Sequence, residues 1–336
     1  MSDPSSFPPA IPKAPKALKT LTPEELETRT VEEESLIYQK LREESEIARK
    51  QMQNEPLREF FYAEAKSRFR GTAQLLTVGD YQVGVSQTEG YRRSMEDEFV
   101  AKAFNLPKFG KVHLFAVLDG HGGDRCVKFT KKLLPRQLKE TLVEFNPKAP
   151  TLTGIFNALK QTFVRVNSAF KTRFPEERSG TVGTAAVIIK GKIWTCNVGD
   201  CRTVLDNGGE PDALSHDASA EDSRYHPSIK ALGGRIADWG DGLRVGGIVA
   251  PARALGDQYV AGLSARGKIT VRDLQKIRPN SQLHLLSDGV SEHISSKELV
   301  GHTHEHIAER VDSVAKNIIH SLEDPENATL LTVRLK

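Results

Sequence analysis

Carboxylates stand at the ends of four apolar, strand-like runs of this sequence. They are Glu96 and Asp97 in "RRSMEDEFV", Asp119 in "VLDGHGG", Asp288 in "HLLSDGVSEHI" and Glu326 in "EDPENATLLTV". Carboxylates without accompanying cysteines or paired histidines suit Mg²⁺ or Mn²⁺ and argue against zinc. Several of them in one cleft would repel one another unless a cation lay between them. The four stretches therefore indicate a site for hard divalent cations.

Such a site would suit phosphoryl chemistry. Two metal ions about 4 Å apart can share a bridging carboxylate, lower the pKa of a bridging water and hold an in-line attack on phosphorus. Each stretch alone also has a simpler interpretation. Asp-Gly is an ordinary turn dipeptide, and adjacent Glu96 and Asp97 could form a charged strand entrance, because their side chains would point to opposite faces.

The elements that would position these residues form a mixed pattern. Short β-like runs follow Gly79, and helix-like stretches cover roughly 122–145, 151–172 and 296–321. Alternation places one set of apolar residues on one face of each of two strands, as in sheets with one buried side: Trp194, Cys196 and Val198, and Leu331, Val333 and Leu335. Paired strands at both ends with helices between them favour an α+β fold with largely antiparallel sheets.

The N-terminal residues have a different composition. Residues 1–23 are rich in Pro, Ser and Lys, which predicts a disordered leader. Residues 24–70 are charged and helix-favouring, with Pro56 interrupting the pattern. Their narrow apolar stripe fits either a helix packed on its own domain or a helix that binds a protein partner.

Charge and cysteine content narrow the class of protein. The chain has 47 basic and 44 acidic residues in 336, a balance that gives no indication of a nucleic-acid or membrane surface. No stretch approaches the roughly 18 apolar residues of a membrane span. The three cysteines are too few for a disulfide framework and are expected to be free thiols. A cytoplasmic or nuclear protein is expected.

Seven segments occur in an order typical of one enzyme family. They are "RRSMEDE", "VLDGHGG", "RSGTVGTAAVII", "WTCNVGDCRTVL", "LGGRI", "RVGGIVAPARALGD" and "LLSDGVSEHISSKEL". In this order they resemble the motifs of the metal-dependent protein serine/threonine phosphatases of type 2C. The resemblance runs from about Tyr81 to the C-terminus and implies a catalytic domain over 80–336. It also implies a sandwich of two antiparallel β-sheets flanked by helices.

The resemblance implies roles for individual residues. It implies a site for two Mg²⁺ or Mn²⁺ ions, made by Glu96, Asp97, Asp119, Gly120, Asp288 and Glu326. In that set Asp119 bridges the two ions, the Gly120 carbonyl is a further ligand and Asp97 orients water. Arg92 matches the residue that grips the substrate phosphate, a task that suits the guanidinium fork. His121 matches the general acid for the departing alkoxide, a role that suits an imidazole titrating near neutrality.

The sequence also departs from the family pattern. The family usually has Asp where this chain has Glu326, and the extra methylene moves the carboxylate by about 1.5 Å. Glu177 lies near a position where the family can hold an Asp for a third metal, but an apparent insertion makes that alignment uncertain, so we do not count it as a ligand.

Two hypotheses follow from the sequence. One is an active phosphatase that hydrolyses phosphoserine and phosphothreonine in phosphoprotein substrates. The other is a weak or inactive phosphatase-like scaffold that engages a partner through its domain or through residues 24–70. Retention of Arg92, Glu96, Asp119, His121 and Asp288 favours the enzyme.

Overall fold

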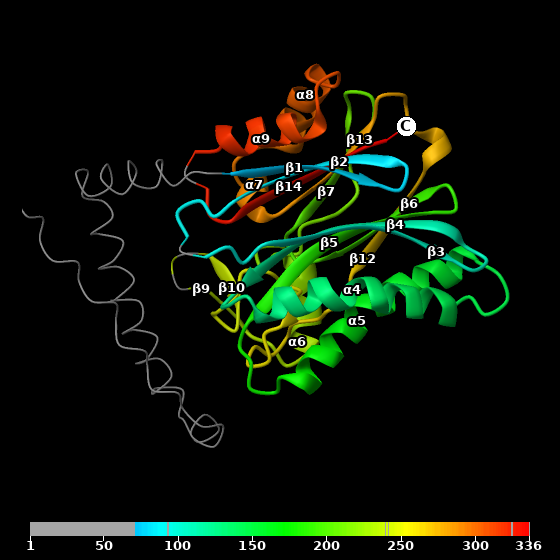
Figure 1. Ribbon diagram of the computed structural model, residues 1–336. Helices are drawn as coiled ribbons and strands as arrows, with labels where there is room; N and C mark the ends of the chain where they lie inside the picture. Colours follow the sequence, from blue (N-terminus) through cyan, green and yellow to red (C-terminus); the bar gives the residue numbers. More distant parts are fainter. Residues whose placement is uncertain (1–70, 93, 239, 241, 324, 336) are drawn as a thin grey trace, which may run out of the picture. The chain divides into compact units, whose positions relative to one another are not determined.

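A computed structural model describes residues 71–335 of this chain, except 93, 239, 241 and 324 (Figure 1). The predictions of a disordered leader over 1–23 and a helical extension over 24–70 lie outside the described residues. None of the helices in the described part combines the length and apolar character of a membrane-spanning segment.

Two antiparallel sheets form the centre of the described chain. The first has the strand order β1 (Thr72–Val78), β2 (Tyr81–Thr88), β14 (Ala328–Arg334), β13 (Gln282–Leu286), β7 (Arg202–Asp206) and β8 (Pro211–Ala213). The second has the order β12 (Lys268–Asp273), β6 (Lys192–Val198), β5 (Gly180–Ile189), β4 (Gly110–His121) and β3 (Glu98–Leu106), with β11 (Leu255–Gly256) paired to β5. The expected α+β sandwich is thus confirmed.

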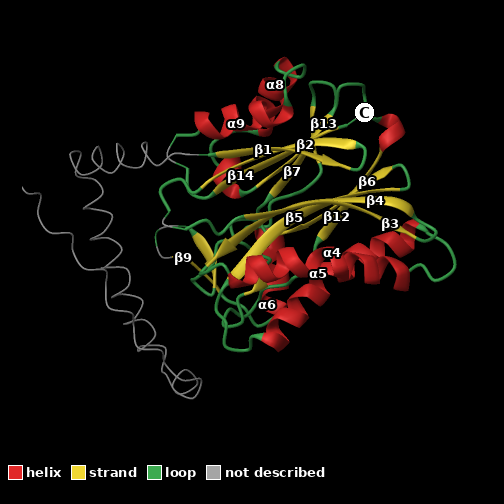
Figure 2. Ribbon diagram, in the orientation of Figure 1, coloured by secondary structure: helices red, strands yellow, loops and turns green. Residues whose placement is uncertain are grey.

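Helices cover the outer face of each sheet (Figure 2). On the second sheet lie α4 (Arg125–Glu144) and α5 (Leu152–Arg173), and on the first lie α7 (Asp288–Ser291), α8 (Ser296–Glu305) and α9 (Val311–Ser321). A smaller apolar cluster is built from η1 (Ser223–Tyr225), α6 (His226–Ala231), β9 (Ile236–Asp238), β10 (Leu243–Val245) and neighbouring loops. A further short turn, η2 (Leu274–Lys276), follows β12.

Strand alternation divides the core into layers. Along β4, Leu114 and Leu118 pack toward α4 and α5, while Phe115 and Val117 pack between the two sheets. Trp194, Cys196 and Val198 share the helix-facing side of β6, and Leu331, Val333 and Leu335 share the inter-sheet side. The predicted faces are confirmed, but the expectation of a single buried side is wrong, because helices bury the outer faces as well.

Further expectations can be compared with the structure. The helix expected over 296–321 is two helices, because the chain leaves α8 at His306 and Arg334 Nη2 donates to the freed carbonyls of Ile307 and Glu309 at 2.8 and 2.5 Å. The strand β1 precedes residue 80, where the sequence placed the start of the domain. All three cysteines are buried free thiols.

Burial in the inter-sheet layer should contribute strongly to stability. Phe115 is fully buried there, and Phe115→Ala should lower the free energy of unfolding by about 3–5 kcal/mol because it leaves a cavity. Phe156→Ala on α5, where the ring is 39% exposed, should cost about 1 kcal/mol or less. Urea denaturation of both variants measures the difference. Equal losses would contradict this division of the core.

Candidate active site

One cleft of about 770 Å³ gathers most of the residues that the sequence singled out. Its walls come from the loop before β3, the end of β4, the loop after β6, the start of α7 and the segment before β14, so both sheets contribute. Its lining includes Arg92, Glu96, Asp119, Gly120, His121, Asp288 and Glu326. Asp97 is not on the surface of the cleft and is only 2% exposed. The roles of these residues stay predictions.

Gly120 allows the backbone at the end of β4 to reach the cleft. The Gly120 N–H donates to the Glu96 carbonyl at 3.1 Å, and a Cβ at Gly120 would lie 2.5 Å from that same oxygen. It would also lie 2.9 Å from the Val127 side chain of α4. Any side chain here would push β4 away from its neighbours, so glycine is what lets the backbone come so close.

Asp97 is a buried carboxylate with one satisfied oxygen. Its Oδ2 accepts hydrogen bonds from Ser287 Oγ and Thr329 Oγ1, both at 2.7 Å. Its Oδ1 has no partner among the described residues. Burial raises the pKa of Asp97 to about 8, although the hydrogen bonds from Thr329 and Ser287 lower it. The charges of Asp288 and Glu326 add to the rise.

Asp119 and Asp200 share this crowding. Burial and then repulsion from Asp288 and Asp97 hold the pKa of Asp119 well above its usual range. Burial, with Asp288 again the nearest charge to contribute, raises the pKa of Asp200 to about 8. The sequence analysis missed Asp200, although it follows an apolar strand and Gly199 in the quoted segment "WTCNVGDCRTVL". A strand end followed by glycine and a carboxylate was the signal that could have found it.

Glu96 is held in place by the residue after Glu326. The Glu96 N–H donates to Asn327 Oδ1 at 2.7 Å, and Asn327 Nδ2 donates to the carbonyls of Glu89 and Ser94 at 3.0 and 2.9 Å. The Glu96 Oε2 accepts the Gly123 N–H at 3.1 Å. Asn327 therefore fixes the loop that carries Arg92 and Glu96 against the start of β14.

Two residues for which the family resemblance implies separate tasks are partners in the structure. Arg92 Nη2 donates to Glu326 Oε2, with the Arg92 side chain 56% exposed and that of Glu326 23% exposed. The longer side chain at 326 thus reaches the guanidinium expected to grip phosphate. Glu177, in contrast, accepts from Arg125 Nη1 at 2.6 Å and is not part of the cleft lining.

The donor set fits hard divalent cations. Oxygen groups dominate the set, and the Oδ1 atom of Asp97 has no partner among the described residues. The carboxylates of Asp97, Asp119 and Asp288 repel one another, and Gly120 gives the backbone access. Within the described residues no three His, Cys, Asp or Glu groups are already drawn together as ligands of one ion. Two of the carboxylates have other partners: Glu326 binds Arg92, and Glu96 accepts the Gly123 N–H. These bonds explain in part why the carboxylates are not drawn together.

His121 lies at the end of β4 in contact with a buried carboxylate. Its Nε2 is 2.9 Å from both Oδ1 and Oδ2 of Asp257, which is 4% exposed and has a positive φ of 44°. Burial opposes the charged imidazolium, but the hydrogen bond and charge of Asp257, with Asp200 and Asp288 behind it, raise the pKa of His121. Asp257 lies in the quoted segment ending "ALGD", yet nothing in the sequence paired it with His121.

Comparison with known proteins identifies the family of this chain. The family model described as Protein phosphatase 2C matches residues 81–326. The chain belongs to the protein phosphatase 2C family. It is 30% identical over 260 residues to probable protein phosphatase 2C 59 of Arabidopsis thaliana, covering 74% of this chain and 72% of that protein. It is 28% identical over 265 residues to protein phosphatase 1L of Bos taurus, covering 76% and 73%.

Other relatives differ more in length or sequence. The chain covers 55% of probable protein phosphatase 2C 32 of Oryza sativa subsp. japonica, to which it is 31% identical. A crystal structure of serine-threonine phosphatase 2C from Toxoplasma gondii has a TM-score of 0.67 at 16% identity, covering 80% of this chain and 99% of that one. At that identity the likeness supports the phosphatase 2C fold.

Gly180 makes room for the His121–Asp257 pair, which gives a structural test. A Cβ at Gly180 would lie 2.2 Å from Asp257 Oδ2 and 2.3 Å from His121 Nε2. We therefore expect Gly180→Ala to break the hydrogen bond between them and to remove the protected imidazole N–H resonance of His121 from NMR spectra. Gly301→Ala, on α8 with open space around it, should leave that resonance in place. Retention of the resonance in Gly180→Ala would contradict this packing.

Proposed function

We propose that this chain is a protein serine/threonine phosphatase that hydrolyses phosphoserine and phosphothreonine in protein substrates with two Mg²⁺ or Mn²⁺ ions. The observation that carries the proposal is the crowding of Asp97, Asp119, Asp200 and Asp288 around one cleft. Like charges crowded at one cleft repel one another unless a cation lies between them. Membership in the protein phosphatase 2C family supports the same reaction.

The cleft residues suggest how cations would be held. Asp119, Glu96, the Gly120 carbonyl, Asp288 and Glu326 are the groups that would hold the ions. Bound ions of this kind supply an activated water for in-line attack on phosphorus and neutralise charge on the phosphate. Asp97, held by Ser287 and Thr329, would orient water from beneath.

Arg92 would bind the phosphate. Its side chain is more than half exposed at the cleft, and the bond to Glu326 engages its Nη2 nitrogen. A guanidinium has five N–H donors in a planar fork, so donors remain for phosphate oxygens.

His121 would act as the general acid. The buried Asp257 carboxylate stabilises the imidazolium and fixes the ring through Nε2. The second ring N–H then remains to protonate the serine or threonine alkoxide as it leaves. A scaffold that had given up catalysis would have no use for this raised imidazole pKa, so the pair favours the enzyme over the phosphatase-like binding protein.

The decisive experiment measures phosphate release from a phosphothreonine peptide with and without Mn²⁺. We expect release only with the ion, and a loss of about 10²-fold or more in Asp119→Asn, because the bridging charge is removed. Asp124→Asn is the matched control, since Asp124 is exposed and pairs with Lys128 at the start of α4. Calorimetry should show weaker Mn²⁺ binding in Asp119→Asn alone. Release without Mn²⁺, or full activity of Asp119→Asn, would refute the proposal.

The role of His121 is tested by changing the leaving group. His121→Gln should slow hydrolysis of a phosphoserine peptide by about 10²- to 10⁴-fold, the usual range for lost general acid catalysis. Hydrolysis of an aryl phosphate should fall much less, because a phenolate leaves without a proton. Steady-state rates on the two substrates give the comparison. Equal losses on both would argue against His121 as the acid.

A further inference from the structure

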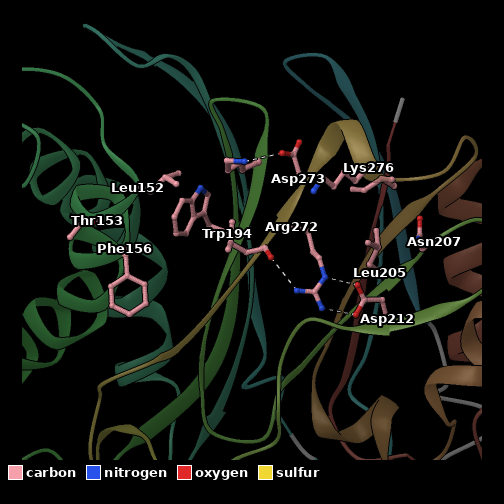
Figure 3. Close-up of a pocket in the computed structure, with 13 residues that line it drawn as sticks. Leu152, Thr153, Phe156, Trp194, Leu205, Asn207, Asp212, Arg272, Asp273 and Lys276 are labelled. Atoms are coloured by element: carbon pink, nitrogen blue, oxygen red, sulfur yellow. Dashed lines mark hydrogen bonds and ion pairs between the residues drawn. The ribbon is translucent and has the colours of Figure 1, made fainter.

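A second cavity lies away from the cleft, at the outer edge of the second sheet (Figure 3). It has a volume of about 650 Å³ and shares no lining residue with the active-site cleft. It runs from the first turn of α5 across β6 and β12 to β8 and η2. We call it the β12 groove; its apolar part is lined by Leu152, Phe156, Trp194 and Val271.

The backbone of β12 is open on one side. Among the described strands β12 pairs with β6 alone. The Leu274 N–H continues that ladder by donating to the Gly191 carbonyl at 2.9 Å. Because hydrogen-bonding direction alternates along a strand, the backbone groups of Ile269, Val271 and Asp273 point away from β6. The Val271 carbonyl accepts only from the side chain of its neighbour Arg272, at 3.1 Å.

The charges of β12 do not protect this edge as charges often do. Arg272 binds both carboxylate oxygens of Asp212 on β8, at 2.6 and 2.8 Å. Asp273 accepts from Lys192 Nζ at 2.9 Å. Figure 3 shows both ion pairs as dashed lines. The outward backbone groups of β12 thus lie between side chains that are already neutralised, and an added strand would replace the bond from Arg272 to the Val271 carbonyl.

The two sides of the β12 groove differ in character. Val271 lies opposite Trp194 on the helix-facing side, near Leu152 and Phe156, and these side chains other than Trp194 are 39–58% exposed. The indole N–H of Trp194 is buried without an acceptor among the described residues. On the inter-sheet side the polar residues Asp212, Asn207 and Lys276 lie beside the apolar side chains of Leu205 and Ile277.

Lys276 adds a positive charge to the inter-sheet side; it also attracts the nearby Asp273 carboxylate, whose ion-pair partner is Lys192. No carboxylate in the described part of the chain lies within ion-pair distance of its ammonium group, whereas the other two cations of the groove are paired. Since side chains of a strand alternate between faces, a strand added to β12 would place every second side chain against the apolar side and the others near Lys276.

We propose that the β12 groove binds an extended segment of a partner protein by strand addition, with apolar side chains alternating with acidic ones. The segment pairs with the outward backbone groups of Ile269, Val271 and Asp273. Its apolar side chains contact Phe156 and Leu152, and an acidic side chain binds Lys276. This binding does not require the phosphatase reaction, because the groove and the cleft are separate.

The test uses the full chain and a fluorescein-labelled peptide of alternating valine and glutamate, eight residues long. We expect saturable binding by fluorescence anisotropy and slowed hydrogen exchange in the segment that contains β12. A peptide in which lysine replaces glutamate should bind about tenfold more weakly or worse, as should one with N-methylated backbone amides on the paired edge. No added phosphate, Mn²⁺ or turnover enters the measurement, so its result is independent of the proposed reaction.

Paired variants locate the site. Phe156→Glu and Lys276→Glu should each weaken peptide binding about tenfold or more. The controls are Val143→Glu on the exposed side of α4 and Lys148→Glu in the loop after it, which should bind as the unaltered chain does. Absence of binding, equal binding of the N-methylated peptide, or equal loss in variants and controls would overturn the proposal. So would a dimer of this chain that Phe156→Glu dissociates, because the groove would then bind a second copy.

Discussion

Asp119 lies near the end of β4, at the cleft, and the charges of Asp288, Asp97 and Asp200 repel its own. Everything else in the cleft is arranged to hold those charges where they are. Asp97 is fixed by hydroxyls from β14 and from the residue before α7, so the side chains that hold it come from the first sheet and the turn that follows β13. Asp119 itself comes from the second sheet. The sandwich therefore serves the site directly, because closing the two sheets brings the like charges together.

That arrangement explains why small residues matter at the cleft. Gly120 lets β4 approach the Glu96 carbonyl, and Gly180 leaves the space in which His121 meets Asp257. The Asn327 amide joins the loop of Glu96 to the start of β14, so movement of one side of the cleft would strain the other. In physical terms the fold stores electrostatic repulsion in a rigid frame, and such a frame is what prepares a site to bind cations without rearranging.

Sequence patterns were sufficient for the features that depend on local order. Apolar runs such as "VHLFAVL" predicted strands, and Asp119, Asp288 and Glu326 at strand ends predicted a shared cleft. Features that depend on tertiary contacts could not be predicted from these patterns. Asp257 approaches His121 from 136 residues away, and the break between α8 and α9 depends on Arg334 of β14. The short strand β12, with its mixture of charged and apolar residues, carried too little pattern to be recognised, although it forms a sheet edge.

The Glu326–Arg92 pair shows how a departure from the family pattern can be compatible with activity. An exposed pair of this kind contributes only about 0–1 kcal/mol, because water solvates both partners when it opens. The Arg92 side chain is more than half exposed, so opening this pair costs little. A carboxylate that moved from Arg92 toward a bound cation would leave the guanidinium for phosphate, and the extra methylene of glutamate supplies the reach for both positions. In this view Glu326 links cation binding to phosphate binding, a coupling that a shorter aspartate, with less reach toward Arg92, would make weaker.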